Sequence, residues 1–200
     1  VPLKPASLNR PAFTDDQITD ISPEAHAFVL KKFRAARTGP LYTPPSKQGT
    51  VIYPGFSGGS LWGGVSFDPE RNWMFVNSNE TTNLCTIIDS KPGESFRFNH
   101  TGYTQLLDHE GYPSIKPPWG WMNAIDLDTG EYVWQVPTGN GDRFRNHPRL
   151  RDLNLPPLGG DGTRTGVVLT KTLVIYNLSA GGTNGGPRMV AYDKATGEEL

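Results

Sequence analysis

Two aspartates stand at the same place in a phrase that the sequence contains twice. Asp126 opens the run DLDTGE, and Asp193 opens the run DKATGE. Closely spaced carboxylates are typical calcium ligands. An Asp followed by Gly is also typical of a tight turn, in which the carboxylate accepts backbone N–H groups and the Gly takes a positive φ. Because both copies place the residues identically, we interpret both aspartates as turn caps rather than metal ligands.

The densest glycine signal lies in residues 55–64, GFSGGSLWGG, where five glycines accompany Trp62. Glycines at this density indicate positive φ angles or a backbone that passes close to another group. A large flat ring in the same stretch suits the wall of a binding cavity, and it suits the packing of one sheet on another equally well. Both readings of Trp62 stay open at this point.

Other reactive residue types are sparse. The four histidines show no metal-ligand spacing, and we predict no metal site within the chain. Cys85 is the one cysteine, which excludes an internal disulfide and a CxxC site, and we interpret it as a small buried hydrophobe.

Composition indicates an all-β chain. The sequence holds 23 Gly and 18 Pro among 200 residues, which is typical of many short strands joined by turns. The net charge of −1 gives no field that would attract nucleic acid or an anionic membrane. No run of eighteen apolar residues is present.

Strands are predicted in the repeated phrase and in several other segments. Each phrase reads as a strand, a turn and a returning strand, so the unit is a repeated β-hairpin. Further strands are expected at 49–54, 65–67, 73–77, 167–169 and 173–176. Residues 78–121 and 139–162 are predicted insertions, which lengthen the spacing between the two phrases.

One helical stretch is predicted between residues 11 and 39. Thr14 with Gln17 fits a capping box, Ser22 precedes a first-turn Pro, and Gly39 is expected to end the helix. The predicted buried face comprises Ala25, Phe28, Val29, Phe33 and Ala36, while Lys31, Lys32 and Arg34 are expected in solvent.

The Asp-x-x-x-Gly hairpin followed by Trp134 resembles the tryptophan-docking repeat of a known family, the pyrroloquinoline quinone (PQQ) dependent dehydrogenases, and in particular of their glucose-dehydrogenase-like branch. Further segments match in the same order: 13–16, 21–25, 39–46, 53–56, 62–64, 67–69, 111–113, 117–120, 146–148 and 155–159. The resemblance covers nearly the whole chain and is to the C-terminal part of the family's propeller.

The resemblance implies an eight-bladed β-propeller, of which this chain is a partial set of blades, with PQQ and a divalent cation, usually calcium, on its axis. It implies oxidation of a sugar or alcohol hydroxyl to a carbonyl, with electrons passed to a cytochrome or a membrane quinone in the periplasm. The cofactor carries the redox chemistry and the protein positions it. The catalytic Asp and most cation ligands of the family lie in earlier blades, so no catalytic residue is expected here.

Two segments match the cofactor side of the family. The first is Leu61, Trp62, Gly63 and Gly64, and the second is Arg164, Thr165 and Gly166. Relatives usually have a polar residue where Leu61 stands, so one hydrogen bond to the quinone is missing there. Arg164 offers a charge for a PQQ carboxylate, or it is an ordinary surface residue.

Domains are predicted as a helical lead-in over residues 1–40 and a partial propeller over 41–200, which stops inside a repeat at Leu200. Such a piece is expected to be inactive without the remaining blades. Two alternatives stay open: a propeller that has lost its cofactor and serves as an interaction scaffold, and a module that pairs with missing blades through its open edges.

Overall fold

The computed structural model describes residues 4–60, 63–160, 165–182 and 186–200. The chain forms two compact units. Unit 1 comprises the described residues of 1–10, 59–80 and 117–200, and unit 2 comprises 11–58 and 81–116. The predicted domain boundary at residue 40 stays a prediction.

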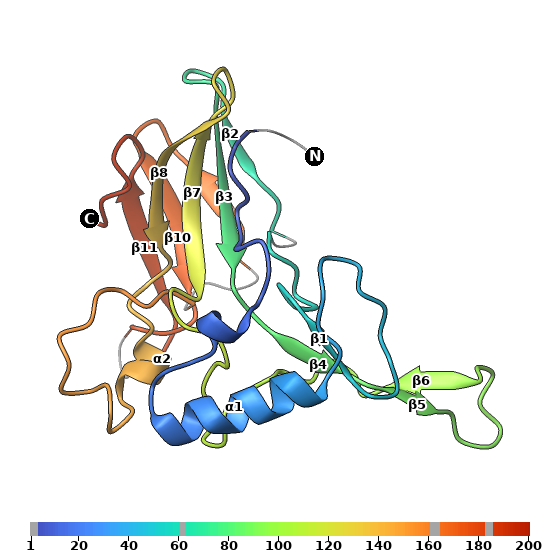
Figure 1. The fold of residues 1–200 in the computed structure, drawn as a ribbon. Coiled ribbons are helices and arrows are strands. Elements are labelled where there is room, and N and C mark those ends of the chain that lie inside the picture. The colour runs from blue at the N-terminus through green and yellow to red at the C-terminus, as the bar shows by residue number, and fades with distance from the viewer. Residues whose placement is uncertain (1–3, 61–62, 161–164, 183–185) are drawn as a thin grey trace. The chain divides into compact units, whose positions relative to one another are not determined.

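The first sheet of unit 1 has four antiparallel strands in the order β2-β3-β7-β8 (Figure 1). They are β2 (Ser66–Asp68), β3 (Trp73–Asn79), β7 (Gly120–Asp126) and β8 (Glu131–Pro137). Spatial order follows chain order, although residues 80–119 lie between β3 and β7. The insertion predicted at 78–121 is shorter in the structure, because residues 78–79 belong to β3 and 120–121 to β7. It leaves the sheet and returns to it without disturbing the pairing of Asn79 with Gly120. We call this sheet blade 1.

The second sheet of unit 1 is blade 2, with β9 (Val167–Leu169), β10 (Leu173–Leu178) and β11 (Arg188–Asp193). Beyond β11, Glu199 forms an isolated antiparallel bridge to Tyr192, where the returning strand of the second phrase is expected. A short helix, α2 (Asp142–Arg145), lies in the second predicted insertion between the blades.

The main core fills the interface between the two blades. Blade 1 contributes Phe75, Met122, Ala124 and Trp134, and blade 2 contributes Val167, Val174, Tyr176, Leu178, Val190 and Tyr192. Alternating positions supply these side chains, because successive side chains of a strand point to opposite faces. At one edge of the interface, Ser66 Oγ of β2 donates a hydrogen bond to the carbonyl oxygen of Val167 in β9. The blades therefore pack face to face with β2 and β9 adjacent.

Unit 2 holds the helical segment and four short strands. The elements are a 3-10 turn, η1 (Asp15–Gln17), helix α1 (Pro23–Ala35), β1 (Thr50–Ile52), β4 (Asn83–Cys85), β5 (Ile87–Asp89) and β6 (Phe98–His100). β1 pairs with β4, and β5 pairs with β6. The second pair projects as a hairpin from the rest of the unit (Figure 1).

Helix α1 starts as predicted and ends earlier than predicted. Ser22 Oγ accepts the Ala25 N–H at 3.0 Å, which confirms the cap. Ala25, Val29 and Phe33 are buried, whereas Phe28 and Ala36 are only partly covered. The expected end at Gly39 is wrong, because Arg37 leaves the helix to form a bridge with Thr50 and its N–H donates to Gly49.

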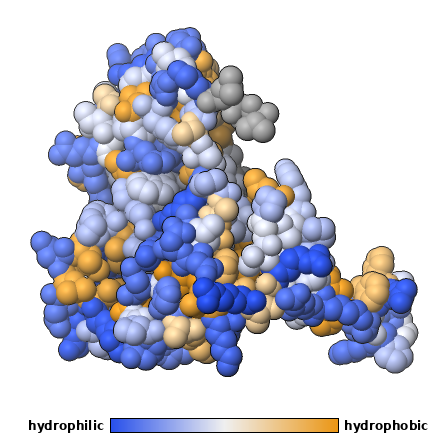
Figure 2. Space-filling model, viewed as in Figure 1, coloured by the Kyte–Doolittle hydropathy of each residue, from blue (hydrophilic) through white to orange (hydrophobic). Residues whose placement is uncertain are grey.

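Polar residues cover most of the face seen in Figure 2, and apolar residues occur there in scattered groups. Among the described residues, no helix has the length and apolar character needed to cross a lipid bilayer.

Candidate functional site

The two segments predicted to face a cofactor meet in unit 1. A Cβ atom on Gly63 would lie 2.6 Å from the carbonyl oxygen of Thr165 and 2.7 Å from Cα of Gly166. Such a distance is closer than any side chain allows, so only glycine permits this approach of the two backbones. Gly63 precedes β2 and Gly166 precedes β9, so the contact lies where the two adjacent strands begin. We call residues 63–64 and 165–166 the glycine cradle.

One side of the glycine cradle is open. Gly64 has φ +74°, and a Cβ added there would meet no atom within 4 Å. Gly63, Gly64 and Gly166 are all exposed. The backbone at Gly64 is therefore open on the side where a Cβ would point, as far as the described residues go.

A buried polar group lies on β3 of blade 1. Asn77 on β3 is fully buried, and among the described residues its amide forms no hydrogen bond of standard geometry, although its side chain interacts with the Tyr176 hydroxyl. Burial raises the pKa of the Tyr176 phenol strongly, as does the neighbouring Tyr192, while hydrogen bonding from Thr165 and Asn77 lowers it. Buried amides are normally satisfied, so Asn77 is a candidate for contact with a bound group.

Sequence reasoning did not single out Asn77. The sequence did hold a signal for it. Asn77 follows Phe75 by two residues on the same strand, and because side chains alternate between the two faces of a sheet, its amide lies on the same buried face as the Phe75 ring. Leu61, Trp62 and Arg164, the other predicted cofactor-side residues, lie outside the described residues, so their roles stay predictions.

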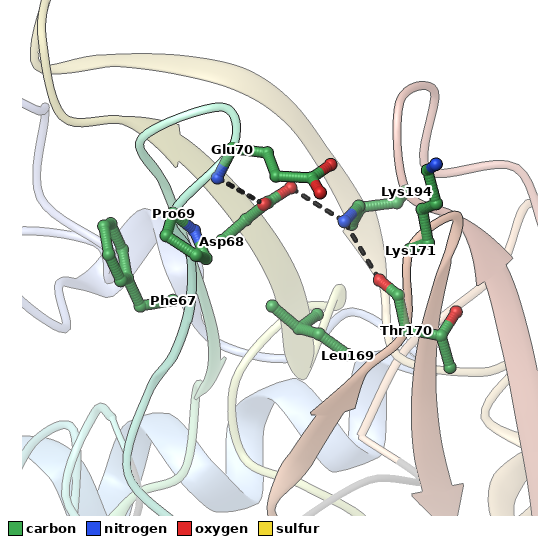
Figure 3. A pocket seen from close by; sticks show the side chains of 8 residues that line it. All are labelled: Phe67, Asp68, Pro69, Glu70, Leu169, Thr170, Lys171 and Lys194. Carbon is green, nitrogen blue, oxygen red and sulfur yellow. Dashed lines mark hydrogen bonds and ion pairs between the residues drawn. The ribbon is translucent and has the colours of Figure 1, made fainter.

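The opposite ends of β2 and β9 border a hollow of about 330 Å³ (Figure 3). Its lining comprises Phe67, Asp68, Pro69, Glu70, Leu169, Thr170, Lys171 and Lys194. Lys194 Nζ lies 2.8 Å from Asp68 Oδ2, and both side chains are 3% exposed. The side chain of Lys171 points away from this ion pair (Figure 3).

The Asp68–Lys194 pair is fully engaged with protein groups. Lys194 Nζ also donates to the Thr170 carbonyl at 2.9 Å, and Asp68 accepts from the Glu70 N–H and from Arg71. The hydrogen bond from Lys194 is the largest cause that lowers the pKa of Asp68, and burial opposes it. A carboxylate with this many donors is a poor base, so the pair serves to join the two blades.

The repeated aspartates are turn caps, as predicted. Asp126 Oδ1 accepts the N–H groups of Asp128 and Thr129, and Asp193 Oδ1 accepts the equivalent two groups of its own turn. Gly130 and Gly197 both have positive φ. In the part of the chain that the structure describes, no three His, Cys, Asp or Glu side chains gather as metal ligands.

Trp134 docks one repeat on the other. Its Nε1 donates to the carbonyl oxygen of Lys194 at 3.1 Å, and its ring lies against Gly197. The docking role predicted for this residue is confirmed.

The family model described as "PQQ: Glucose/ethanol/alcohol dehydrogenase, beta-propeller domain" matches residues 1–200. The chain belongs to this family. The blades described above are therefore blades of a quinoprotein β-propeller, and the predicted all-β partial propeller is confirmed.

Curated relatives of this quinoprotein family agree. A quinate/shikimate dehydrogenase (quinone) from Acinetobacter baylyi is 28% identical over 185 residues, covering 78% of this chain and 22% of its own length. A quinoprotein glucose dehydrogenase from Escherichia coli is 29% identical over 179 residues, covering 74% of this chain and 22% of its own. A glycerol dehydrogenase large subunit from Gluconobacter oxydans is 30% identical, covering 90% of this chain and 28% of its own. The match thus covers 22% to 28% of the length of these relatives.

Proposed function

We propose that this chain is part of a PQQ-dependent dehydrogenase that oxidises a hydroxyl group of a sugar or another alcohol. The observation that carries the proposal is the contact of Gly63 with Thr165 and Gly166, which joins two segments matched independently to the cofactor side of the family. Membership of the family supports the assignment of PQQ.

The residues present suit a flat, polar, anionic ring system. The glycine cradle has exposed backbone at Gly64, and Asn77 offers a buried amide that forms no hydrogen bond of standard geometry with the described residues. Leu61, Trp62 and Arg164 complete the proposed set, with Trp62 as a ring that limits the cavity and Arg164 as a partner for a carboxylate. When bound, PQQ supplies the hydride acceptor.

The residues of this chain bind and orient rather than transfer protons. The carboxylates of Asp68, Asp126 and Asp193 are held as ion-pair or turn partners. We therefore place the base that removes the substrate proton, and most ligands of a calcium ion, in parts of the protein outside this chain. The 200 residues alone are expected to be inactive.

The electron acceptor is proposed to be a cytochrome or a membrane quinone, and the protein is proposed to act in the periplasm. The family resemblance supports both proposals, and the word "quinone" in the name of the Acinetobacter relative supports a quinone as the acceptor. Nucleic acid is not an expected partner, because the net charge is −1.

The test uses the full-length protein, freed of cofactor and then titrated with PQQ and calcium. Glucose, quinate and glycerol are offered as substrates with a redox dye as acceptor. Saturable binding, seen by absorbance, together with dye reduction by at least one hydroxyl substrate is the expected result. A folded protein that binds no PQQ would contradict the proposal.

One observation favours a second candidate, a propeller that serves as a scaffold. Leu61 is apolar in a segment that the family resemblance assigns to the cofactor side, so its side chain offers no hydrogen bond to a quinone. The titration separates the two functions, since a scaffold stays folded with no PQQ bound.

A further inference from the structure

A tyrosine hydroxyl is buried deep in the interface between the blades. Tyr176 of β10 is 1% exposed and belongs to the same apolar cluster as Phe75 and Val174. Burying a hydroxyl in apolar surroundings is unfavourable unless it forms hydrogen bonds. A phenylalanine would fill the same space without that cost, so the hydroxyl calls for an explanation.

Strand pairing places Tyr176 beside the glycine cradle. The side chains of Thr165 and Asn77 both hydrogen-bond with the Tyr176 hydroxyl and lower its pKa, and the carbonyl oxygen of Thr165 contacts Gly63. Tyr176 pairs in register with Val167, two residues after Thr165, so strand pairing already holds the tyrosine beside this segment. The ring is locked by the core, and the hydroxyl therefore provides a fixed point for Thr165.

The glycine cradle needs such a fixed point. Gly63, Gly64, Thr165 and Gly166 lie outside the regular strands, since β2 begins at Ser66 and β9 at Val167. Glycine has more backbone freedom than any other residue, so local sequence does not hold these residues in one conformation. Binding sites lose affinity when their shape must be ordered by the ligand.

We propose that Tyr176 is a positioning residue, which acts through the side chain of Thr165 to hold the Thr165–Gly166 backbone against Gly63 and so keeps the glycine cradle in its binding shape. The proposal rests on the proposed function, because the ligand of the cradle is the planar, anionic quinone. Tyr176 itself does not touch the ligand.

The first experiment needs no cofactor. Full-length apoprotein carrying Tyr176→Phe is compared with wild type by hydrogen exchange of the peptides that contain Gly63 and Gly166. The matched control is Tyr192→Phe, which removes a hydroxyl from another buried tyrosine of the same cluster. Tyr176→Phe should speed exchange in both peptides while Tyr192→Phe leaves them unchanged. Unchanged exchange in Tyr176→Phe would overturn the proposal.

The second experiment measures PQQ affinity of the same proteins. Loss of one hydrogen bond that orders the site should weaken binding about three- to tenfold in Tyr176→Phe. Thr165→Val should have a similar effect, and the double variant should be no weaker than the worse single variant, because both changes break one link. Losses of PQQ affinity that add up in the double variant would contradict the positioning role. An equal loss of affinity in Tyr192→Phe would contradict it too. Wild-type protein that binds no PQQ would refute the proposed function and leave the exchange experiment to decide on Tyr176.

Discussion

The indole of Trp134 lies against Gly197, so closely that a Cβ on this glycine would sit 2.7 Å from Trp134 Cδ2. Trp134 ends the first copy of the repeated phrase, and Gly197 belongs to the second copy. The repeat therefore contacts itself across the blade interface. Glycine is required at position 197 for two reasons, because it leaves room for the Trp134 ring and also takes φ +76° in the turn.

Replacing Gly197 by alanine tests this contact. Gly197→Ala should destabilise the full-length protein by about 1–3 kcal/mol more than Gly130→Ala, because the added methyl group collides with a buried ring. Gly130 is the matched control, since it occupies the same turn position with φ +69° and its neighbour Lys4 is exposed and able to move. Urea unfolding measures both variants. Equal losses would show that backbone conformation alone explains the cost.

The Asp68–Lys194 ion pair predicts a dependence on pH. The pKa of Asp68 is lower in the folded protein than in the unfolded chain, so the pair stabilises the fold above about pH 4. This contribution is lost as pH falls through the folded-state pKa. Asp68→Asn should cost about 3 kcal/mol at pH 7, because Lys194 stays buried without its partner.

Thermal unfolding at pH 7 and at pH 3 measures this effect in full-length protein. The difference in melting temperature between wild type and Asp68→Asn should be smaller at pH 3 than at pH 7. Glu131→Gln is the control. Glu131 forms an exposed ion pair with Lys4, so this substitution should lower the free energy of unfolding by less than about 1 kcal/mol. A difference that stays constant between the two pH values would exclude the ion pair as its cause.

Cys85 should resist thiol reagents in the native protein. Its side chain is buried at 2% exposure, and burial raises the pKa of the thiol. Both effects lower the amount of accessible thiolate at pH 8. Mass spectrometry of the Cys85 peptide after brief iodoacetamide treatment should show little labelling in buffer and complete labelling in urea. Fast labelling of the folded protein would mean that the Cys85 region opens readily.

The turn role of Asp126 predicts an order among substitutions. Asp126→Asn keeps an oxygen that accepts the N–H groups of Asp128 and Thr129, whereas Asp126→Ala loses both hydrogen bonds. The melting temperature should fall more for alanine than for asparagine. Calcium content of the full-length protein, measured by metal analysis, should be the same in both variants and in wild type. Loss of calcium in Asp126→Ala would restore the metal-ligand interpretation.

Local sequence signals predicted most of the elements. The repeated phrase predicted both hairpin turns, because an Asp that caps a turn and a Gly with positive φ act within six residues. Ser22 likewise predicted the start of α1, because its side chain accepts the N–H of Ala25, only three residues further along the chain. The end of α1 was missed, since a bridge to the distant Thr50 draws Arg37 out of the helix.

The sequence by itself determined the blade strands, their turns and the family, because these depend on neighbouring residues and on ordered motifs, whereas β4, β5 and β6 lie in a segment predicted only as an insertion. Only the tertiary structure decided which residues of the repeat are buried. Leu127 and Lys194 occupy the same position in the two phrases, yet the leucine is 46% exposed and the lysine 3%. The lysine is buried because the Asp68 carboxylate and the Thr170 carbonyl, both outside the repeated phrase, accept hydrogen bonds from its ammonium group. The glycine cradle arose in the same way, since Gly63 and Gly166 meet only when the blades pack.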